Sequence, residues 1–453
     1  MLHDGRGLAL TTTRLRAVSA MEAATFSLLA HRTDLGTHIE AALAADAGLV
    51  AAHALAGFGA RIQAREELEA AASRHLAAAR GALLRRGGTP RERMLVAALA
   101  AWHEHADMPG AASHLRHIVR DDPHDLLALK LEHALRFMLG DAQGMRQALE
   151  EAAPAWTPTI AGHGFVLGLR AFAMEETGEV VLAEHLGRAA VAAEPGDLWG
   201  GHAVAHVFEG DGRAREGLEW IAALAPQIEA GGCFGRHLIW HAALLHLHLG
   251  QNDAALALLD TRMLDQPAED ARDFANAASL LWRLEAQGLA VGRARWDRLA
   301  DIAERRAAER GMAFFDLHQV MALGGAGRRD GLRSKLSAMR DRAEDFAEPQ
   351  AEVLAECGVP VAEALALMQA GAAGAAVDIL LPLRRELRML GGSNAQRDIF
   401  ERMLVEACIA AGRSGTAGAL LDQRAGRRVA GAWEERCEAR LALAEGDAVR
   451  TLV

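Results

Sequence analysis

The sequence contains no tyrosine, and aromatic residues make up only 4% of its 453 positions. Strands draw on aromatic and β-branched side chains, so this scarcity disfavours a sheet-rich fold. Alanine is abundant along the whole chain, and it is the strongest helix former. Hydrophobic residues make up 51% and charged residues 24%, which excludes general disorder. The composition therefore favours a folded, helical protein.

Cysteine is also scarce. The four cysteines are scattered and form no CxxC pair: Cys233, Cys357, Cys408 and Cys437. This spacing argues against a disulfide framework and against a structural zinc site built on cysteine. The first residues lack the basic start and apolar core of a secretory signal, and no window of about 18 uncharged apolar residues is present. We therefore expect a cytoplasmic protein with no membrane partner.

Positive charge is in deficit. Lysine and arginine number 49 against 60 acidic residues, which gives a formal net charge of −11. The basic runs, such as Arg85-Arg86 and Arg384-Arg385, are short and lie among acidic residues. A chain of this charge has no evident means of attracting phosphate backbones. We therefore expect that nucleic acid is not a partner.

Several catalytic signatures are absent as well. The sequence has no GxSxG elbow, phosphate-binding glycine loop, HExxH motif or dinucleotide fingerprint. Their absence argues against the common hydrolase and nucleotide chemistries.

What the sequence does contain is a regular series of turns. Apolar residues recur at three- and four-residue steps in segments that end at glycine or proline, which indicates amphipathic helices. Six glycines are each followed five residues later by a small or apolar residue: Gly140 and Met145, Gly178 and Ala183, Gly212 and Gly217, Gly250 and Ala255, Gly371 and Ala376, and Gly412 and Ala417. Successive glycines from 140 to 250 are 38, 34 and 38 residues apart, and the last two are 41 apart.

This spacing predicts a repeated helix–turn–helix unit. A period near 34 residues is that of the tetratricopeptide repeat. In such a unit the glycine ends the first helix, helix A, in a left-handed conformation, and the small residue lets helix B approach closely. The segment ETGEVVLAEHLGRAAVAAEP fits best, with Ala183, Ala190 and Pro195 at the expected spacing. The alternative is that glycine ends many helices and the steps agree by accident.

The sequence divides into three parts on this basis. Residues 1–90 are helical but irregular, residues 91–424 carry the repeats, and residues 425–453 resemble a terminal capping helix. No long or low-complexity linker separates them. We expect an all-α, tetratricopeptide-like solenoid of antiparallel helix pairs in a superhelix, with a concave face lined mainly by helix A side chains.

Two histidine pairs lie in the repeats. GHAVAHVFE contains His202 and His206, and RHLIWHAALLHLHLG contains His237 and His241. Residues four apart share one helix face, so two imidazoles so placed can chelate one metal ion. In a chain with 20 histidines about one such pair is expected by chance, so the count alone is weak.

The location of the pairs is more informative. The position of each histidine can be counted back from the turn glycine of its repeat, at about 100° per residue. By this count all four imidazoles fall within an arc of about 100° on equivalent A helices of neighbouring repeats. Glu209 lies about 60° from the centre of that arc and His133 about 100° from it. This arrangement predicts a polar pocket in which neutral imidazoles bind metal or act as acid and base. The alternative is a set of buried histidines that bond between packed helices.

Other candidates lie nearby in the pattern. In FFDLHQVMA, Asp316 and His318 point to different sides of one helix, and the carboxylate can orient an imidazole of a neighbouring repeat. Trp199 and Trp240 each stand close before a histidine and can stack on a ligand, although tryptophans of this kind are more often core residues.

The segment LGGSNAQRD, residues 390–398, contains a capping box. Ser393 is the N-cap and Gln396 follows three residues later. The box does not use Asn394, Arg397 and Asp398, which it leaves available to a ligand, and Arg397 can hold a carboxylate through two hydrogen bonds.

At these motifs the sequence resembles the family of tetratricopeptide repeat protein 38 and its bacterial relatives. The resemblance lies in HAVAHVFE, the W-H-x-A-L segment at 240–244, SLLWRLEAQGLAVG at 279–292, FFDLHQVMA at 314–322 and LGGSNAQRD. It extends from about residue 95 to 420 in consistent order, and it implies an all-helical cytosolic protein without a defined reaction. Leu238 and Ala134 stand where the family often has Asn and Asp, which implies a more apolar pocket.

Two functional hypotheses follow. The first is a binding protein whose concave, histidine-lined groove holds a small molecule or a peptide. The second is a hydrolase or lyase in which His202, His206, His237 and His241 hold a divalent metal ion, the one cofactor that the sequence suggests. In a catalytic site, His206, His241, Glu209 and Asp316 would be the acids and bases. In a metal-free variant one histidine would be the base and Arg397 would bind an anionic substrate. The oligomeric state stays open, with a homodimer as one alternative.

Overall fold

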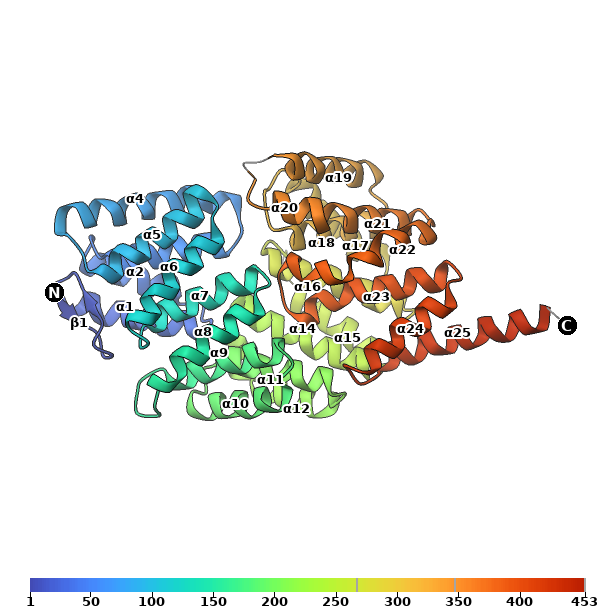
Figure 1. Ribbon diagram of the computed structural model, residues 1–453, viewed down its shortest axis with the longest axis horizontal. Helices are drawn as coiled ribbons and strands as arrows, with labels where there is room; N and C mark the ends of the chain where they lie inside the picture. Colours follow the sequence, from blue (N-terminus) through green and yellow to red (C-terminus); the bar gives the residue numbers. More distant parts are fainter. Residues whose placement is uncertain (266–267, 346–347, 452–453) are drawn as a thin grey trace. The chain divides into compact units, whose positions relative to one another are not determined.

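The computed structural model describes residues 1–265, 268–345 and 348–451, and the regular secondary structure of these residues is almost entirely helical (Figure 1). The exception is a short antiparallel pair of strands, β1 (Leu2–His3) and β2 (Ala9–Leu10), in which Leu2 faces Leu10. The described residues form two compact units. Unit 1 comprises residues 1–207 and 224–235, and unit 2 comprises residues 208–223 and 236–453.

Eleven helices lie wholly within unit 1, among the described residues: α1 (Leu15–Leu29), α2 (Leu35–Ala45), α3 (Val50–Ile62), α4 (Glu69–Arg86), α5 (Pro90–His105), α6 (Met108–Asp121), α7 (Leu126–Met138), α8 (Ala142–Ala152), α9 (His163–Glu176), α10 (Val180–Ala193) and α13 (Ala225–Ala230). Short 3-10 turns occur at Glu66–Leu68 and Ala153–Ala155. Two further helices, α11 (Leu198–Gly210) and α14 (Gly232–His248), contribute residues to both units.

The described helices of unit 2 are α12 (Ala214–Ala223), α15 (Asn252–Leu258), α16 (Ala271–Ala286), α17 (Arg293–Arg305), α18 (Ala313–Gly325), α19 (Arg329–Glu344), α20 (Ala351–Val353), α21 (Val359–Gln369), α22 (Ala373–Leu380), α23 (Asn394–Ala410), α24 (Ser414–Ala425) and α25 (Ala432–Thr451). Two π-helical turns, Leu259–Met263 and Leu354–Gly358, and a 3-10 segment, Pro382–Leu390, complete the unit.

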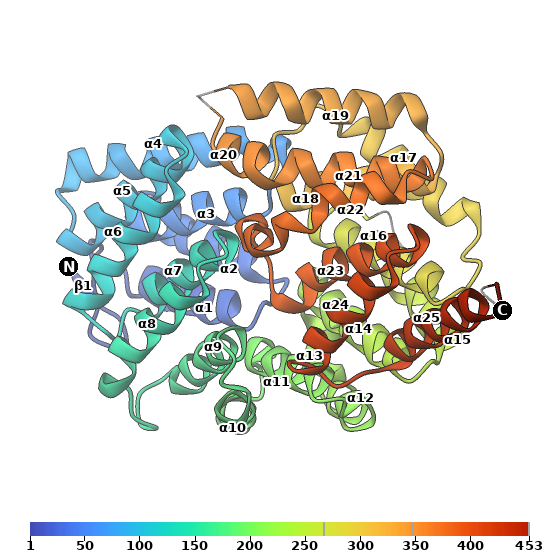
Figure 2. The same cartoon turned by 45° about the vertical axis from the view of Figure 1, so that its right-hand side comes forward.

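Consecutive helices pack against each other as hairpins. In unit 1 the pairs α1 and α2, α3 and α4, α5 and α6, and α9 and α10 are in contact, and Figure 1 shows α9 and α10 side by side. In unit 2 the pairs α17 and α18, α21 and α22, and α23 and α24 do the same, and α19 lies along α21 (Figure 2). The prediction of an all-α, tetratricopeptide-like helical-repeat fold is therefore confirmed.

The turns are formed as the sequence predicts. All six turn glycines have positive φ angles, from 68° at Gly140 to 89° at Gly178. The left-handed conformation is strained for any residue with a Cβ, which explains the choice of glycine. The partner residues five positions later, from Met145 to Ala417, are all buried in the described structure. Helix A and helix B can therefore approach closely in each repeat.

Both terminal parts of the described chain contain regular secondary structure. The predicted irregular part, residues 1–90, contains α1 to α4 and the small strand pair, which the sequence did not predict. Within the predicted capping segment, α25 buries Trp433 and Cys437 against unit 2. The boundaries at residues 90 and 424 and the single continuous solenoid stay predictions. None of the helices in the described part of the chain has both the length and the apolarity that a transmembrane segment needs.

Candidate functional site: two buried histidine pairs

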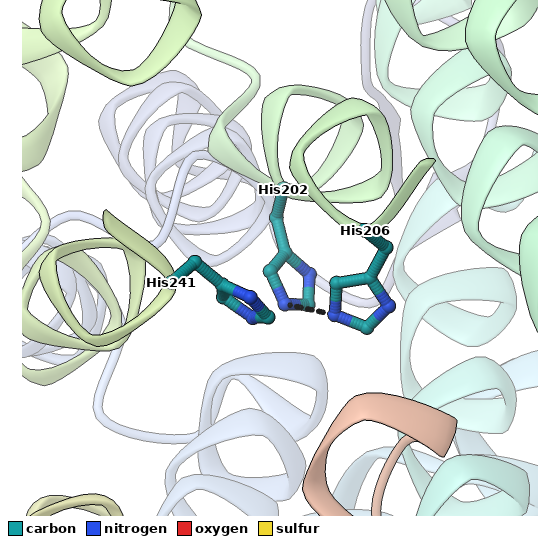
Figure 3. Close-up of side chains that lie close together, drawn as sticks. All are labelled: His202, His206 and His241. Atoms are coloured by element: carbon teal, nitrogen blue, oxygen red, sulfur yellow. Dashed lines mark hydrogen bonds between the residues drawn. The ribbon is translucent and has the colours of Figure 1, made fainter. Parts of the chain in front are cut away.

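The first histidine pair lies on α11. The Oδ1 atom of Asp197 accepts the backbone N–H of Trp199 at 3.2 Å, which satisfies a free donor at the start of the helix. One turn further on, His202 and His206 point to the same face, and both are buried. Their Nε2 atoms are 2.9 Å apart (Figure 3), so one of the two must carry the proton of this hydrogen bond. Figure 3 draws this pair together with His241, which comes from α14.

Helix α9 supplies the surroundings of this pair in unit 1. Nδ1 of His206 is 3.0 Å from Oε2 of Glu175 and 3.9 Å from Oε1 of Glu176. The ring of Phe172 stacks on His202, with centroids 5.4 Å apart and planes at 17°. Ligand atoms of His206, Glu175 and Glu176 all lie within 4.8 Å of one another, a spacing that suits a metal ion.

The second pair, on α14, repeats this arrangement in unit 2. His237 and His241 have their Nε2 atoms 3.2 Å apart. Nδ1 of His241 is 3.3 Å from Oε2 of Glu209, and Nδ1 of His237 is 3.2 Å from Oδ1 of Asn276. Trp240 stacks on His237, with centroids 5.2 Å apart. Glu209, which the sequence places to the side of the histidine arc, contacts His241, and its role as a site residue stays a prediction.

The two pairs share one geometry. In each pair the Nε2 atoms face each other, and Nδ1 of the second histidine faces a carboxylate. Metal-binding histidines in proteins usually hold a carboxylate or carbonyl on the nitrogen that does not bind the metal. A common pocket for all four imidazoles stays a prediction, because the pairs belong to different units.

His133 and Trp199 lie together in unit 1. The indole Nε1–H of Trp199 donates to Nε2 of His133 at 3.1 Å. Burial lowers the pKa of His133 well below its ordinary value, and the nearby Lys130 lowers it further. A neutral imidazole is consistent with its role as acceptor. His133, which the sequence places at the edge of the histidine arc, therefore accepts a hydrogen bond from Trp199.

Sequence reasoning missed a buried lysine at this point. Nζ of Lys130 lies 3.0 Å from Nε2 of His31 and 4.4 Å from the centroid of the Trp199 ring. Burial lowers the pKa of Lys130 to about 8, although Asp197 opposes this shift. The sequence contains a signal: the chain has only two lysines among its 49 basic residues. Both Lys130 and Lys335 are buried, which is rare for lysine unless it is specifically partnered.

Asp316 and His318 of α18 have local partners in unit 2. The carboxylate of Asp316 accepts from Lys335 Nζ at 2.6 Å and from Arg342 Nη1 at 2.7 Å, so each oxygen is ion-paired. His318 Nδ1 lies 2.7 Å from the backbone oxygen of Phe314, and burial lowers the pKa of His318 to about 4. Asp316 and His318 have different partners, which is consistent with residues two apart pointing to different sides of a helix.

The capping box of α23 is present as predicted. The hydroxyl of Ser393 accepts the N–H of Gln396, and the side chain of Gln396 accepts the N–H of Ser393. Arg397 donates to the oxygens of Gly391 at 3.2 Å and of Asn394 at 2.9 Å. Arg397 therefore bonds both Asn394 and the turn before the helix.

The fold and the buried pairs define a helical-repeat protein with imidazoles inside its units. No protein-family model matches the chain. Among solved structures it is similar to human IFIT1, determined as a dimer with m7Gppp-AAAA. The identity is 14%, the match covers 82% of this chain and 89% of that chain, and the TM-score is 0.37. A likeness at this level carries no argument about a ligand of this chain.

One expectation from the sequence, the exclusion of nucleic acid, is corrected here. The structure of IFIT1 was determined with m7Gppp-AAAA, and the exclusion of nucleic acid conflicts with this match. The exclusion was wrong because it rested on the formal net charge of −11, which sums over the whole surface. A net charge does not describe the local potential of one face, so it cannot exclude a partner.

Proposed function

We propose that the chain is a helical-repeat binding protein that holds a divalent transition-metal ion on its paired imidazoles. A small molecule or peptide would bind at that ion. The observation that carries the proposal is the orientation of the rings, with Nε2 facing Nε2 at 2.9 Å in one pair and 3.2 Å in the other. Two nitrogens on a tetrahedral zinc ion, each about 2.0–2.1 Å from the metal, would be separated by about 3.3 Å. Small side-chain rotations would therefore suffice to admit an ion.

The groups on the Nδ1 atoms support this proposal. If His206 donates its Nδ1–H to Glu175, and His241 donates its Nδ1–H to Glu209, the Nε2 lone pairs are free to bind a metal. The carboxylates also fix the ring orientation and make the imidazoles more basic. Glu175 and Glu209 would then be the residues that position the ligands.

The enzyme hypothesis has less support. A general base needs a carboxylate oxygen that is able to accept a proton from a metal-bound water. Asp316 is ion-paired through both oxygens, and Glu209 contacts His241 with one oxygen and Arg428, at 2.5 Å, with the other. The metal-dependent hydrolase or lyase therefore stays a prediction from the sequence.

The resemblance to the tetratricopeptide repeat protein 38 family and a cytoplasmic location belong to the same proposal. His206 and Trp240 lie in the motifs that carry this resemblance. Cys357, Cys408 and Cys437 are buried thiols, which is consistent with a reducing compartment.

The test is direct metal binding. The full-length protein is stripped with a chelator and titrated with Zn²⁺, Mn²⁺ or Fe²⁺ in a calorimeter, with metal content measured by elemental analysis. We expect His206→Ala and His241→Ala to lose metal while the helical circular dichroism stays close to that of the wild type. His185→Ala, at an exposed position, is the matched control. If the wild type binds no metal, or if both variants unfold, the histidines are structural and the proposal fails.

Glu175→Gln tests the supporting carboxylate. Loss of a carboxylate behind a metal-binding histidine typically weakens metal affinity by about 10–100-fold. We expect that loss here, with no change in fold, because glutamine keeps the shape of the side chain. The control is Glu179→Gln, which removes an exposed carboxylate just before α10. Equal affinities for these two variants would show that Glu175 does not support a metal ligand.

A further inference from the structure

A small cavity in unit 2 is lined by an unusual number of charged side chains. It has a volume of about 20 Å³. The charged and titratable residues around it come from α11, α14, α16, α23, α25 and the segment before α25: Glu209, His248, Arg283, Arg402, Arg428 and Glu434. Burial lowers the pKa of His248, so this imidazole adds no charge near neutral pH.

Arg283 stands out among these residues because it has no ionic partner. It is 3% exposed, and its two Nη atoms donate to neutral acceptors, the hydroxyl of Ser279 and the backbone oxygen of Ala395. Its guanidinium lies 5.6 Å from the centroid of the Trp240 ring. Among the described residues no carboxylate oxygen lies within ion-pair distance of it, and no acceptor bonds its Nε–H. Burial lowers the pKa of Arg283 to about 9, and the nearby Arg402 lowers it further.

The other guanidinium groups near the cavity are all paired, and Arg402 and Arg428 are less deeply buried than Arg283. Arg402 and Arg424 bond Asp398 and Glu434, and Arg428 bonds Asp398 and Glu209. Arg424 also bonds Glu401 at 3.3 Å, and Glu401 bonds the exposed Arg427 at 3.2 Å. Among the side chains that line the cavity itself, three guanidinium groups, those of Arg283, Arg402 and Arg428, face two carboxylates, those of Glu209 and Glu434. The cavity lining therefore carries one surplus positive charge.

An uncompensated buried charge is strongly unfavourable, and a bound anion removes the cost. The cavity exceeds the roughly 10–15 Å³ that one water molecule needs, so it has room for a compact group. A planar guanidinium matches a planar carboxylate in shape and charge. We propose that this cavity, with Arg283 as its anchor, binds the carboxylate group of a small organic acid.

The proposal does not rest on the metal site. Arg283 belongs to the segment SLLWRLEAQGLAVG and Asp398 to LGGSNAQRD, two motifs that the metal proposal does not use. A carboxylate supplies the single negative charge that would balance the surplus guanidinium group. A dianion such as phosphate would exceed that charge.

Formate is the probe, because it is the smallest carboxylate. Sodium formate is titrated into the full-length wild type at constant ionic strength, with the bulky sulfonate MES as the replacement anion. We expect a saturable rise in melting temperature and a saturable calorimetric signal with formate. An equal, unsaturable response to both anions would overturn the proposal. Binding of chloride without binding of formate would overturn the assignment to a carboxylate.

Two variants with opposite expected effects identify the residues. Arg283→Met removes the surplus charge and should weaken formate binding at least about tenfold, as expected for loss of a charge-assisted hydrogen bond. Glu434→Gln adds a second surplus charge and should tighten formate binding. Arg305→Met, which removes an exposed guanidinium, should leave it unchanged. Unchanged affinity in folded Arg283→Met contradicts the proposal. If Arg283→Met does not fold, Glu434→Gln decides the question. The proposal is contradicted if Glu434→Gln binds formate no more tightly than the wild type does.

Discussion

Asp197 combines deep burial with a pKa close to neutral. Its carboxylate packs directly on Gly168 and Gly200, where a Cβ would lie 1.8 Å and 2.6 Å from Oδ2. No partner bonds Oδ2 among the described residues, and Lys130 acts on it only at longer range. Burial therefore raises the pKa of Asp197 from 3.8 to about 7, against the opposing effect of backbone N–H donors. The folded protein holds a proton that the unfolded chain has already released.

This shift predicts how stability depends on pH. A raised pKa contributes stability that is fully present below the unfolded value of 3.8 and is lost as pH rises through about 7. Asp197→Asn removes this dependence, because the amide is neutral at every pH. We expect the free energy of unfolding of the variant to fall less between pH 5 and pH 7.5 than that of the wild type, by an amount on the order of 1–3 kcal/mol. Urea unfolding at both pH values measures it.

Asp121→Asn is the control for this experiment, since Asp121 is exposed near the end of α6. It should change the free energy of unfolding equally at the two pH values. If Asp197→Asn shows the same pH dependence as the wild type, the carboxylate of Asp197 is charged throughout this range.

The sequence predicts contacts between residues a few positions apart. It does not predict contacts between residues that are far apart in the chain. The histidine pairs and the Ser393 capping box follow from positions three or four apart, which helix geometry fixes. Lys130, in contrast, contacts His31, which is 99 positions away in the chain. Arg283 bonds Ala395, which is 112 positions away. No periodicity in one sequence relates such partners, because only the packing of helices brings them together.

At the scale of the helices, the turn glycines are the main signal from which the helix pairs could be predicted. Their positive φ angles end each first helix, and the spacing between them sets the repeat. The elements that the sequence missed have weaker signals. The strands β1 and β2 are two residues each and are joined by a turn in which Asp4 accepts the N–H of Arg6 and of Leu8 at 2.9 Å. Such short strands have no alternating pattern to detect.

Two glycines of unit 2 test this role of the turns. Gly412 separates α23 from α24 with φ 71°, and Gly418 lies inside α24. A Cβ would meet no atom within 4 Å at either position, so only the backbone conformation differs. We expect Gly412→Ala to destabilise the protein by about 1–2 kcal/mol, and Gly418→Ala to stabilise it by about 0.5–1 kcal/mol. Thermal unfolding of both variants measures the difference, and effects of equal sign would contradict this account.

At the scale of the whole chain, the division into two units could not be predicted. Sequence reasoning looks for boundaries in linkers rich in glycine, proline or charge. The boundaries at 207/208 and 235/236 lie inside α11 and α14, which are continuous helices. Net charge also fails to predict a binding partner at this scale, because a sum over 453 residues does not describe the electrostatic potential of one protein face. Both properties arise from three-dimensional packing, which composition does not contain.

The shared helices predict how the chain unfolds. If one unit unfolded alone, α11 and α14 would each have to break within their length, which would leave unpaired backbone groups at new helix ends. Each break also removes the packing that stabilises a helix in water. We therefore expect one cooperative transition in scanning calorimetry, with a calorimetric enthalpy equal to the van't Hoff enthalpy. Two resolved transitions, or a van't Hoff enthalpy near half the calorimetric value, would show that the helices divide and that each unit folds by itself.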